Sequence, residues 1–414
     1  MKITYLHQYF NTPSMWGSHR SYEMAKRLVN QGHEVKVITA YLKNDVKKSF
    51  DTNIDGIDVH WIPVPYSNHL SFRKRIWAFI KFSFLAIPNT LKHKSDLIFA
   101  TSTPLTISIP AIICKIITRR KFVFEVRDLW PELPIAINAI RNPFIVSLAK
   151  ILEKISYYYA DAVIALSPGM KEGIIKAGKM PSSVAVIPNL CDFKLKKDDP
   201  PNITTLIKNI DNKKPIIAFT GSFGLINNIE WIVDLGNELD KINSNVQILL
   251  IGDGKAKDKV KQKIDKLKLN NRVKIIKPFP KKDMPVILNN ITMSVITFND
   301  IPEMRNNSAN KFFDALATGR PIIINFGGWI NTLITENNCG IDGWRIALSE
   351  LAIEVDSKCN DIMWLEYAGK NSLELGKKYF DRDIAAINLG KIFNEVLNGR
   401  NKVSHLVEED YCLK

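Results

Sequence analysis

Short apolar segments alternate with helical segments along almost the whole chain, and this pattern restricts the possible folds more than any other feature. In the first half, the segments predicted as strands are 2–6, 34–39, 97–100, 121–126, 162–166 and 182–188. Helical segments lie between most of them. This alternation is typical of parallel α/β sheets, so a Rossmann-like domain is expected.

The same alternation begins again after 190–212, a polar and basic segment that we interpret as a linker. The strands predicted in the second half are 215–220, 246–251, 273–277, 293–297 and 321–324. At 414 residues the chain is too long for one ordinary core, so two α/β domains with a crevice between them are expected. The predicted parts are an N-terminal domain at 1–192, a C-terminal domain at 193–380, a helix at 381–400 that packs back on the N-terminal domain, and a polar tail at 401–414.

Charge and cysteine content narrow the range of functions. The formal net charge is +15, which favours an acidic partner such as nucleic acid, an anionic membrane or a phosphorylated substrate. Five scattered cysteines without a CxxC pair favour a reduced, cytoplasmic protein without disulfides or zinc. No apolar stretch reaches the ~18 residues of a transmembrane helix, and the first residues resemble a strand rather than a signal peptide.

The segment 308–325 predicts a short helix that ends at Gly319 and continues through a proline into an apolar strand. Asn310 is expected to cap this helix. Lys311 favours phosphate binding, because a helix N-terminus and a nearby cation both attract anions. Asp314, one turn further on, can accept hydrogen bonds from sugar hydroxyls. Phosphate together with ribose indicates a nucleotide.

Further candidates follow other strands of the second half, at the strand ends where open α/β sheets bind ligands. Gly221 and Gly224, with Ser222 between them, allow a ligand to approach the backbone. Lys255 could reach a phosphate, although the Asp-Gly before it is also a common turn. Phe279 could offer an aromatic face to a base, and a structural Pro-rich connection is an equally good interpretation.

In the first half, the candidates follow the predicted strands 2–6 and 121–126. Gly17 lies in a long loop before a helix, where backbone amides could meet a sugar or a phosphate. A surface loop with one turn glycine is the alternative. Arg127 and Asp128 directly follow a buried strand, and an arginine there could bind phosphate or sugar hydroxyls through two hydrogen bonds. The alternative is a structural Arg–Asp ion pair.

The segment 70–87 combines cations with apolar and aromatic residues. Its cations and one flanking aromatic residue are Arg73, Lys74, Arg75, Lys81 and Trp77. This composition is typical of a helix that lies in an anionic membrane interface. A helix packed on the first sheet, with a basic outer end, is the alternative.

Taken in order, these motifs resemble GT-B glycosyltransferases of the large retaining family 4, also called glycosyltransferase group 1. The matching stretches are GSHRSYEMAKRLVNQGHEVKVIT, EVRDLWPE, ADAVIALSPGMKEGI, VIPNLCD, GDG and SANKFFDALATGRPII. Within the family, the resemblance is closest to bacterial O-antigen and capsule enzymes such as N-acetyl-fucosamine transferases. It implies the GT-B fold, in which two Rossmann-like parallel-sheet domains face a central cleft.

The resemblance also implies roles for individual residues. Asp314 would contact the ribose, with Asn310 and Lys311 in the same motif, and the loop from Gly221 to Gly224 would face the diphosphate. By the same resemblance, Gly17 would lie near the donor and Arg127 near the reacting sugar. The chain departs from the family pattern in two places, because Asn306 replaces an expected acid and no basic pair follows the Gly221 loop. Lys311, Arg127 or Lys255 would then replace the usual phosphate contacts.

The implied reaction is retaining transfer of a sugar, without a metal or other cofactor, with Arg127, Asp128 and Lys311 as the catalytic residues. The donor would be a nucleotide sugar, usually UDP-linked, such as an N-acetylated deoxyhexosamine. The acceptor would be a saccharide on polyprenyl diphosphate, used for O-antigen or capsule synthesis on the inner face of the cell membrane. A GT-B-fold nucleotide-sugar epimerase is the alternative, but it needs acid/base carboxylates that the sequence does not offer convincingly. No nucleic acid partner is expected, since no nucleic-acid-binding motif is present.

Overall fold

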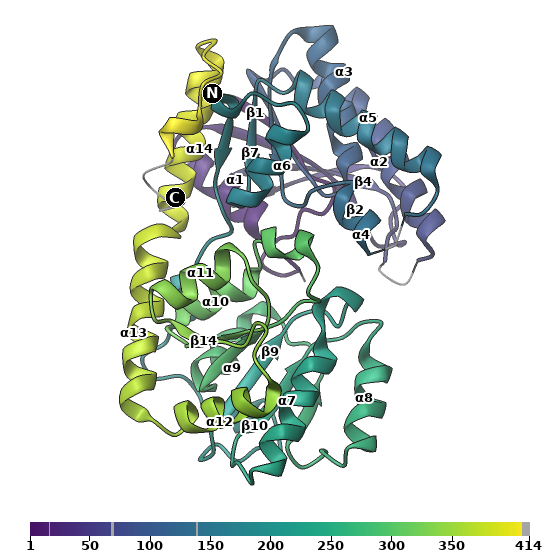
Figure 1. Cartoon of the computed structure of the whole chain (residues 1–414). Helices are drawn as coiled ribbons and strands as arrows, with labels where there is room; N and C mark the ends of the chain where they lie inside the picture. Colours follow the sequence, from purple (N-terminus) through teal and green to yellow (C-terminus); the bar gives the residue numbers. More distant parts are fainter. Residues whose placement is uncertain (16, 68–69, 138–139, 408–414) are drawn as a thin grey trace. The chain divides into compact units, whose positions relative to one another are not determined.

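The computed structural model describes residues 1–407 except 16, 68–69 and 138–139 (Figure 1). The chain forms two compact units. Unit 1 consists of Met1–Pro188 and the segment that begins at Arg382, and unit 2 consists of Asn189–Asp381. The chain therefore enters unit 2 slightly before the boundary expected at 192.

Unit 1 contains an eight-stranded sheet in the order β3-β4-β2-β1-β5-β6-β7-β8. The strands are β1 (Lys2–Leu6), β2 (Glu34–Tyr41), β3 (Phe50–Ile54), β4 (Ile57–Pro63), β5 (Leu97–Thr101), β6 (Lys121–Val126), β7 (Ala162–Ala165) and β8 (Val184–Val186). Neighbouring strands pair in parallel except for β3 and β4, which are antiparallel. The six strands predicted for this half are confirmed.

The β3–β4 hairpin was not predicted. Asp55 and Gly56 connect its strands, with φ values of 52° and 82°. Two consecutive residues with positive φ are the signature of a tight hairpin turn, and Asp-Gly is a favoured sequence for it. The signal was thus present in the sequence.

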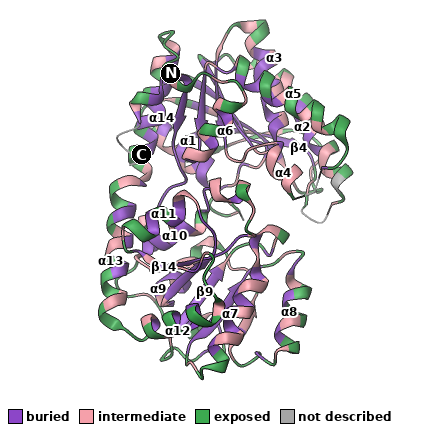
Figure 2. Cartoon of the chain, viewed as in Figure 1, coloured by how far each residue is buried: buried purple, intermediate pink, exposed green. Residues whose placement is uncertain are grey.

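Helices cover both faces of this sheet. They are α1 (Arg20–Asn30), α2 (Phe72–Lys92), α3 (Ser108–Thr118), α4 (Glu132–Ala136), α5 (Pro143–Tyr159), α6 (Pro168–Lys176) and α14 (Arg382–Leu397). Residues of α2, α3, α5 and α6 share one buried core with the strands, and Figure 2 shows these strands as buried. Helices α1 and α14 contact each other, and Phe393 of α14 packs edge-on against Phe99 of β5. No described helix has the combination of length and apolar content that crossing a bilayer requires.

The described part of the tail predicted as polar is packed on unit 1. Val403 and Val407 are buried, and the Val403 N–H donates to the carbonyl oxygen of Ser182 at 2.8 Å. Lys171 donates to Ser404 Oγ at 2.8 Å. These contacts anchor an otherwise polar segment. Residues 408–414 lie outside the described part of the chain.

Unit 2 contains a six-stranded parallel sheet in the order β11-β10-β9-β12-β13-β14. The strands are β9 (Ile216–Thr220), β10 (Gln247–Ile251), β11 (Val273–Ile276), β12 (Met293–Ile296), β13 (Ile322–Ile324) and β14 (Gly340–Asp342). The helices are α7 (Ile229–Lys241), α8 (Lys257–Lys266), α9 (Met284–Asn290), α10 (Asn310–Thr318), α11 (Trp329–Glu336), α12 (Leu348–Cys359) and α13 (Ile362–Tyr379). The two parallel-sheet α/β units confirm the predicted fold class, although β14 and α11 to α13 were not predicted.

The segment interpreted as a linker is part of unit 2. Its buried residues Leu195, Ile203, Ile207 and Ile210 pack against Leu249 and other residues of the sheet. The linker interpretation was wrong because this segment, although mostly polar, also contains apolar residues at spacings of three to four.

Candidate active site

In unit 2, the loops after the central strands β9 and β10 interlock through their backbones. The Gly221 N–H donates to the carbonyl oxygen of Ile251 at 3.0 Å. A Cβ atom on Gly252 would lie 1.8 Å from the Gly221 carbonyl oxygen, and one on Gly254 would lie 2.6 Å from the Phe223 carbonyl oxygen. Neither glycine can therefore carry a side chain. The close approach leaves the backbone of Gly221 exposed at the carboxyl end of the sheet.

Lys311, in the first turn of α10, lies against this loop. A Cβ atom on Gly221 would be 3.1 Å from Lys311 Cε, so these two predicted residues are brought together. Lys311 Nζ lies 4.0 Å from the ring centroid of Phe219 and 5.2 Å from that of Phe298. Within the described part of the chain, no carboxylate forms an ion pair with Lys311. Burial lowers the pKa of this ammonium group to about 7. The site thus holds a cation that lacks an anionic partner.

The start of α10 differs from the expected one. Asn310 is the first helical residue, Ala309 occupies the cap position, and no side chain caps the helix. The capping role predicted for Asn310 is therefore wrong. Ser308 is instead held from outside the helix, because Asn189 donates to its hydroxyl at 3.1 Å and to its carbonyl oxygen at 2.6 Å. An uncapped helix start leaves backbone N–H groups for an anion.

The rest of the predicted segment agrees with the structure. The helix ends at Gly319, whose φ of 65° is the left-handed conformation expected there. Asp314 lies on α10 one turn after Lys311 and is partly buried. Thus Asn310, Lys311 and Asp314 share one helix, as predicted, beside the glycine loop.

Other predicted donor residues are placed less closely. Ser222 is exposed and accepts a hydrogen bond from Asn227 Nδ2 at 3.3 Å, in the loop that leads to Gly224. Lys255 is exposed in the turn before α8. Phe279 follows the edge strand β11. It packs against the buried cluster that includes Ile203 and Ile207, which favours the interpretation of this segment as a structural connection.

In unit 1, Arg127 extends from the end of β6 to the loop after β1. Its Nη2 donates to Ser18 Oγ at 3.0 Å, and its Nη1 lies 3.4 Å from His7 Nε2. Its backbone N–H donates to Ser102 Oγ at 2.9 Å. Among the described side chains, Arg127 makes no ion pair with Asp128, so the structural alternative considered for this pair is not formed. The guanidinium charge instead has neutral partners.

Two titratable groups near Arg127 have shifted pKa values. Burial, and secondarily the charge of Arg127, lowers the pKa of His7 well below its usual value, so this imidazole is neutral near pH 7. Burial raises the pKa of Asp128 to about 6, although Arg127 opposes the shift. Shifted pairs of this kind are enriched in active sites. His7 was not among the predicted residues, although its position directly after the first strand was a usable signal.

The loop that carries Gly17 is closed by its own contacts. His19 Nε2 lies 2.9 Å from the carbonyl oxygen of Thr12 and 3.1 Å from that of Met15. Gly17 has a φ of 114°, and a Cβ atom there would lie 2.6 Å from Asn11 Nδ2. Only glycine fits this turn, so the backbone conformation explains why a glycine stands at position 17. Gly17 is exposed.

Behind this loop, Arg20 and Glu125 form a buried ion pair. Arg20 Nη2 and Nε donate to Glu125 Oε1 at 2.8 Å and 3.0 Å, and Thr101 Oγ1 donates to Glu125 Oε2 at 2.5 Å. The two side chains are 4% and 2% exposed. Arg20 begins α1 and Glu125 belongs to β6, so the pair ties together the segments that carry Ser18 and Arg127. Sequence reasoning did not find this pair.

Within the described residues, no three His, Cys, Asp or Glu side chains are close enough together to hold a metal ion.

Comparisons with known proteins agree with this organisation. Residues 17–190 match the family described as "Glycosyl transferase 4-like domain", and residues 205–343 match "Glycosyl transferases group 1". The chain is therefore a glycosyltransferase, built from the two domains that these families define. No curated protein sequence matches it significantly.

Solved structures show the same fold along nearly the whole chain. Sucrose-phosphate synthase from Thermosynechococcus elongatus is similar with a TM-score of 0.78 and 15% identity, over 96% of this chain and 99% of that chain. Anabaena HepE, solved with UDP and glucose, has a TM-score of 0.71 and 18% identity, over 95% and 100%. WaaG, a glycosyltransferase involved in lipopolysaccharide biosynthesis, has a TM-score of 0.67 and 13% identity, over 96% and 100%. The fold is thus of the GT-B type.

Proposed function

We propose that this enzyme transfers a sugar, with retention, from a UDP-linked donor to a saccharide on polyprenyl diphosphate in bacterial surface polysaccharide synthesis. The observation that carries the donor assignment is the placement of Lys311 beside the glycine loop at Gly221, as a partly buried cation with which no carboxylate of the described residues forms an ion pair. A diphosphate would supply the missing negative charge. The similarity in fold to HepE, which was solved with UDP and with UDP-glucose, supports UDP as the nucleotide.

The proposed chemistry assigns roles to residues of each unit. Departure of the sugar leaves negative charge on the diphosphate, and the Lys311 ammonium with the uncapped start of α10 would stabilise this charge without a metal. In the proposed scheme, Arg127 and Asp128 act near the reacting sugar. The acceptor hydroxyl attacks from the side that the diphosphate leaves, and a phosphate oxygen accepts its proton. Asp314 would accept hydrogen bonds from the ribose hydroxyls.

Two similarities support the proposed acceptor and cellular role. The fold is similar to that of WaaG, a glycosyltransferase involved in lipopolysaccharide biosynthesis. The motif resemblance to O-antigen and capsule enzymes supports an N-acetylated deoxyhexosamine as the sugar. A lipid-linked acceptor would place the enzyme on the inner face of the cell membrane, in the cytoplasm.

Helix α2 supports this location through its outer face. Phe82 is fully buried in the core of unit 1, whereas Trp77 is 66% exposed, between the exposed cations Lys74 and Lys81. The buried face agrees with packing on the first sheet, and the exposed face has the composition on which the membrane interpretation rests. Of the remaining predicted cations, Arg73 is exposed, and Arg75 donates to the Tyr66 hydroxyl at 3.0 Å. We propose that the outer face of α2 contacts anionic lipid.

The donor assignment is tested by thermal unfolding in the presence of nucleotides. UDP and its preferred sugar conjugate are expected to raise the melting temperature, because a ligand at 100 times its Kd adds about 2.7 kcal/mol to the free energy of unfolding. AMP and inorganic diphosphate are the controls and are expected to act weakly. If neither UDP nor any UDP-sugar shifts the transition of the folded protein, the proposed donor is wrong.

Gly221→Ala is expected to weaken UDP binding by about tenfold, because the residue has a φ of 145° and its Cβ would press on Lys311 Cε. Isothermal titration measures this effect. Gly178→Ala is the matched control, since Gly178 has a φ of 108° with no atom within 4 Å of an added Cβ. That variant should lose some stability and keep its UDP affinity. Equal UDP affinity of the Gly221 variant and wild type would remove the loop from the donor site.

A further inference from the structure

Helix α5 exposes large apolar side chains along one face. They are Phe144, Leu148, Ile151, Ile155 and Tyr158. Spacings of four, three, four and three residues place them in a single stripe on a helix. Phe144 is 69% exposed and Tyr158 is 80% exposed, whereas the opposite face buries Ser156 and Tyr157 in unit 1. A helix at a protein–water boundary normally carries polar residues where α5 has this stripe.

Two neighbouring helices also expose apolar side chains. Helix α3 contacts both α2 and α5, and Figure 1 shows these helices together on one side of unit 1. Helix α3 exposes Ile116 and Ile117, and α2 exposes Trp77, Phe84 and Leu85. We call the exposed side chains of these three helices the α2–α3–α5 face. Exposed apolar side chains that gather on neighbouring elements are a mark of interaction surfaces.

The charges on this face have one sign. Helices α2 and α3 contain no Asp or Glu, and the only acid in α5, Glu153, is buried. The exposed cations on or beside the face are Arg73, Lys74, Lys81, Arg141, Lys150 and Lys154. Cations interleaved with apolar side chains match a bilayer, where lipid phosphates lie directly above the acyl chains. A second copy of the same face would bring like charges together, which disfavours self-association.

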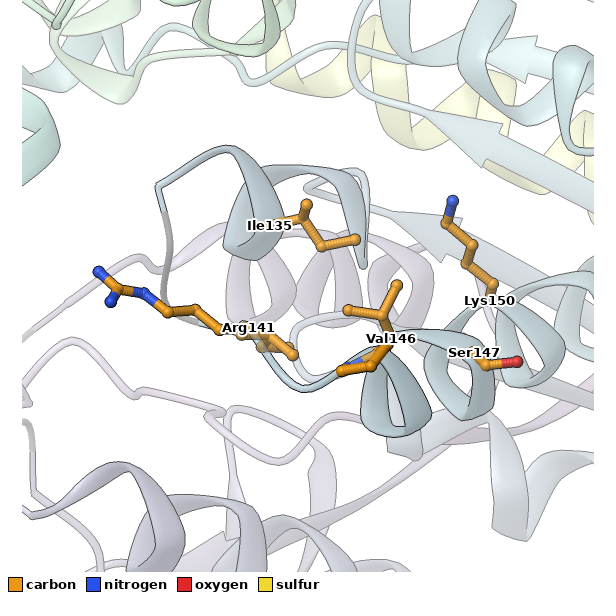
Figure 3. A pocket seen from close by; sticks show the side chains of 7 residues that line it. Ile135, Arg141, Val146, Ser147 and Lys150 are labelled. Atoms are coloured by element: carbon orange, nitrogen blue, oxygen red, sulfur yellow. The ribbon is translucent and has the colours of Figure 1, made fainter.

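A cleft beside α5 offers a place for a lipid phosphate. It has a volume of about 520 Å³. Figure 3 shows Arg141 and Lys150 at its two ends, with Ile135 of α4 and Val146 of α5 between them. Apolar walls with a cation at each end suit a molecule that carries both an acyl chain and a phosphate.

We propose that the α2–α3–α5 face lies on an anionic lipid bilayer, with α5 parallel to the surface and Phe144, Leu148 and Ile151 among the acyl chains. This inference deepens the membrane contact proposed for α2 and rests on that part of the proposed function. It assigns the main apolar contact to α5, a helix for which no membrane contact was predicted. It does not depend on the identity of the donor or the acceptor.

The test is flotation of the full-length protein with vesicles of phosphatidylcholine, with and without phosphatidylglycerol, at low salt. The variant Phe144→Ser/Leu148→Gln/Ile151→Gln is expected to bind mixed vesicles at least about 100-fold more weakly, since each large apolar side chain contributes about tenfold to partitioning. The matched control removes three exposed apolar side chains of α13 in unit 2, as Ile362→Gln/Met363→Gln/Tyr367→Gln. The control variant is expected to float like the wild type.

A variant with fewer cations separates the electrostatic contribution to vesicle binding from the apolar contribution. Lys150→Gln/Lys154→Gln is expected to lose part of the enhancement by phosphatidylglycerol, because four of the six cations remain, and to keep the weak binding to phosphatidylcholine. Lys261→Gln/Lys266→Gln, which removes two exposed cations of α8, is its control and should bind like the wild type.

Three results would overturn the proposal. The first is flotation of the α5 variant equal to that of the wild type, and the second is a wild type that does not bind mixed vesicles at low salt. The third is a wild-type dimer that the α5 substitutions dissociate, which would make this face an interface between copies. Stabilisation by UDP is measured on the same α5 variant, and it should be unchanged. A failure of the membrane proposal is thereby distinguished from a failure of the donor assignment.

Discussion

Replacement of Lys311 by alanine is expected to lower turnover about 100-fold, the effect of removing one donor that stabilises developing negative charge. Lys311 lies beside Gly221 and above the rings of Phe219 and Phe298, and no described carboxylate pairs with it. In the proposed mechanism the departing diphosphate is its ionic partner, so the interaction is stronger in the transition state than in the bound donor. Steady-state transfer assays in the presence of EDTA measure the effect on kcat.

Arg127→Ala is expected to lower turnover to a similar extent. The guanidinium contacts the neutral side chains of His7 and Ser18, so its positive charge is available to a substrate. Lys261→Ala is the control for both, since Lys261 is an exposed cation of α8 to which no role in the site is assigned, and it should leave kcat nearly unchanged. The catalytic assignment is wrong if the Lys311 and Arg127 variants both turn over at near-normal rates.

The lowered pKa of Lys311 predicts that the activity of the enzyme depends on pH. Burial lowers this pKa from 10.5 to about 7, so the free enzyme loses the ammonium as the pH rises through 7. The value of kcat/KM is expected to fall on the alkaline side, and in Lys311→Arg this fall should disappear because arginine stays protonated. A bound diphosphate raises the pKa, so kcat should fall at a higher pH than kcat/KM does.

The same shift has a consequence for stability. The unfolded chain holds the Lys311 proton up to pH 10.5, whereas the folded chain releases it near pH 7. Stability therefore rises with pH across this window, and below it the buried ammonium is unfavourable. Lys311→Met is expected to lose activity while its melting temperature stays equal to or above that of the wild type.

Loss of Arg20 is expected to lower the free energy of unfolding by about 3–5 kcal/mol, the cost of leaving one member of a buried ion pair alone. In Arg20→Met, the Glu125 carboxylate loses both hydrogen bonds from the guanidinium and keeps the one from Thr101. Arg20 also donates to backbone carbonyl oxygens after β8, including that of Ile187 at 2.9 Å. Guanidinium-induced unfolding measures the effect on the transition of unit 1.

An exposed ion pair serves as the control. Lys2 and Glu34 lie 2.9 Å apart with side chains 54% and 70% exposed, so Lys2→Met should cost less than about 1 kcal/mol. The double variant Arg20→Met/Glu125→Gln should recover part of the loss, because it removes the uncompensated charge. Equal costs for Arg20→Met and Lys2→Met would show that the buried pair does not stabilise the unit.

The pair also predicts acid sensitivity. Burial alone would raise the pKa of Glu125, but the charge and hydrogen bonds of Arg20 lower it below its usual value of 4.5. A lowered carboxyl pKa stabilises the folded state above the unfolded value and loses this contribution as the pH falls. Unit 1 of the wild type should therefore lose more stability on acidification than unit 1 of Arg20→Met.

The sequence predicted the elements that depend on local signals. Most of the parallel strands are largely apolar, and Gly319 ends α10 where a left-handed residue was expected. Local signals were also missed, since Asp55-Gly56 indicates the β3–β4 hairpin and the spacing of Ile203, Ile207 and Ile210 indicates a packed segment. The sequence therefore contained the information for both features, although neither was predicted.

Contacts between distant residues could not be predicted in the same way. Glu125 is one of 42 acids in the chain, and nothing near it in sequence identifies Arg20 as its partner. The Phe219 and Phe298 rings below Lys311 come from two different strand ends. The α5 stripe was missed for another reason, because apolar residues cover both faces of the helix and a core helix has the same composition.

The division of unit 1 into two segments has a consequence for the order of folding during synthesis. Unit 2 is one continuous segment, Asn189–Asp381, and all of it leaves the ribosome before Arg382 does. Phe99 of β5 packs against Phe393 of α14, so the part of the unit 1 sheet under α14 stays uncovered until the last helix has been made. Unit 1, which begins the chain, is thus the last unit to be completed. Until α14 has been made, the early strands of unit 1 are exposed to aggregation.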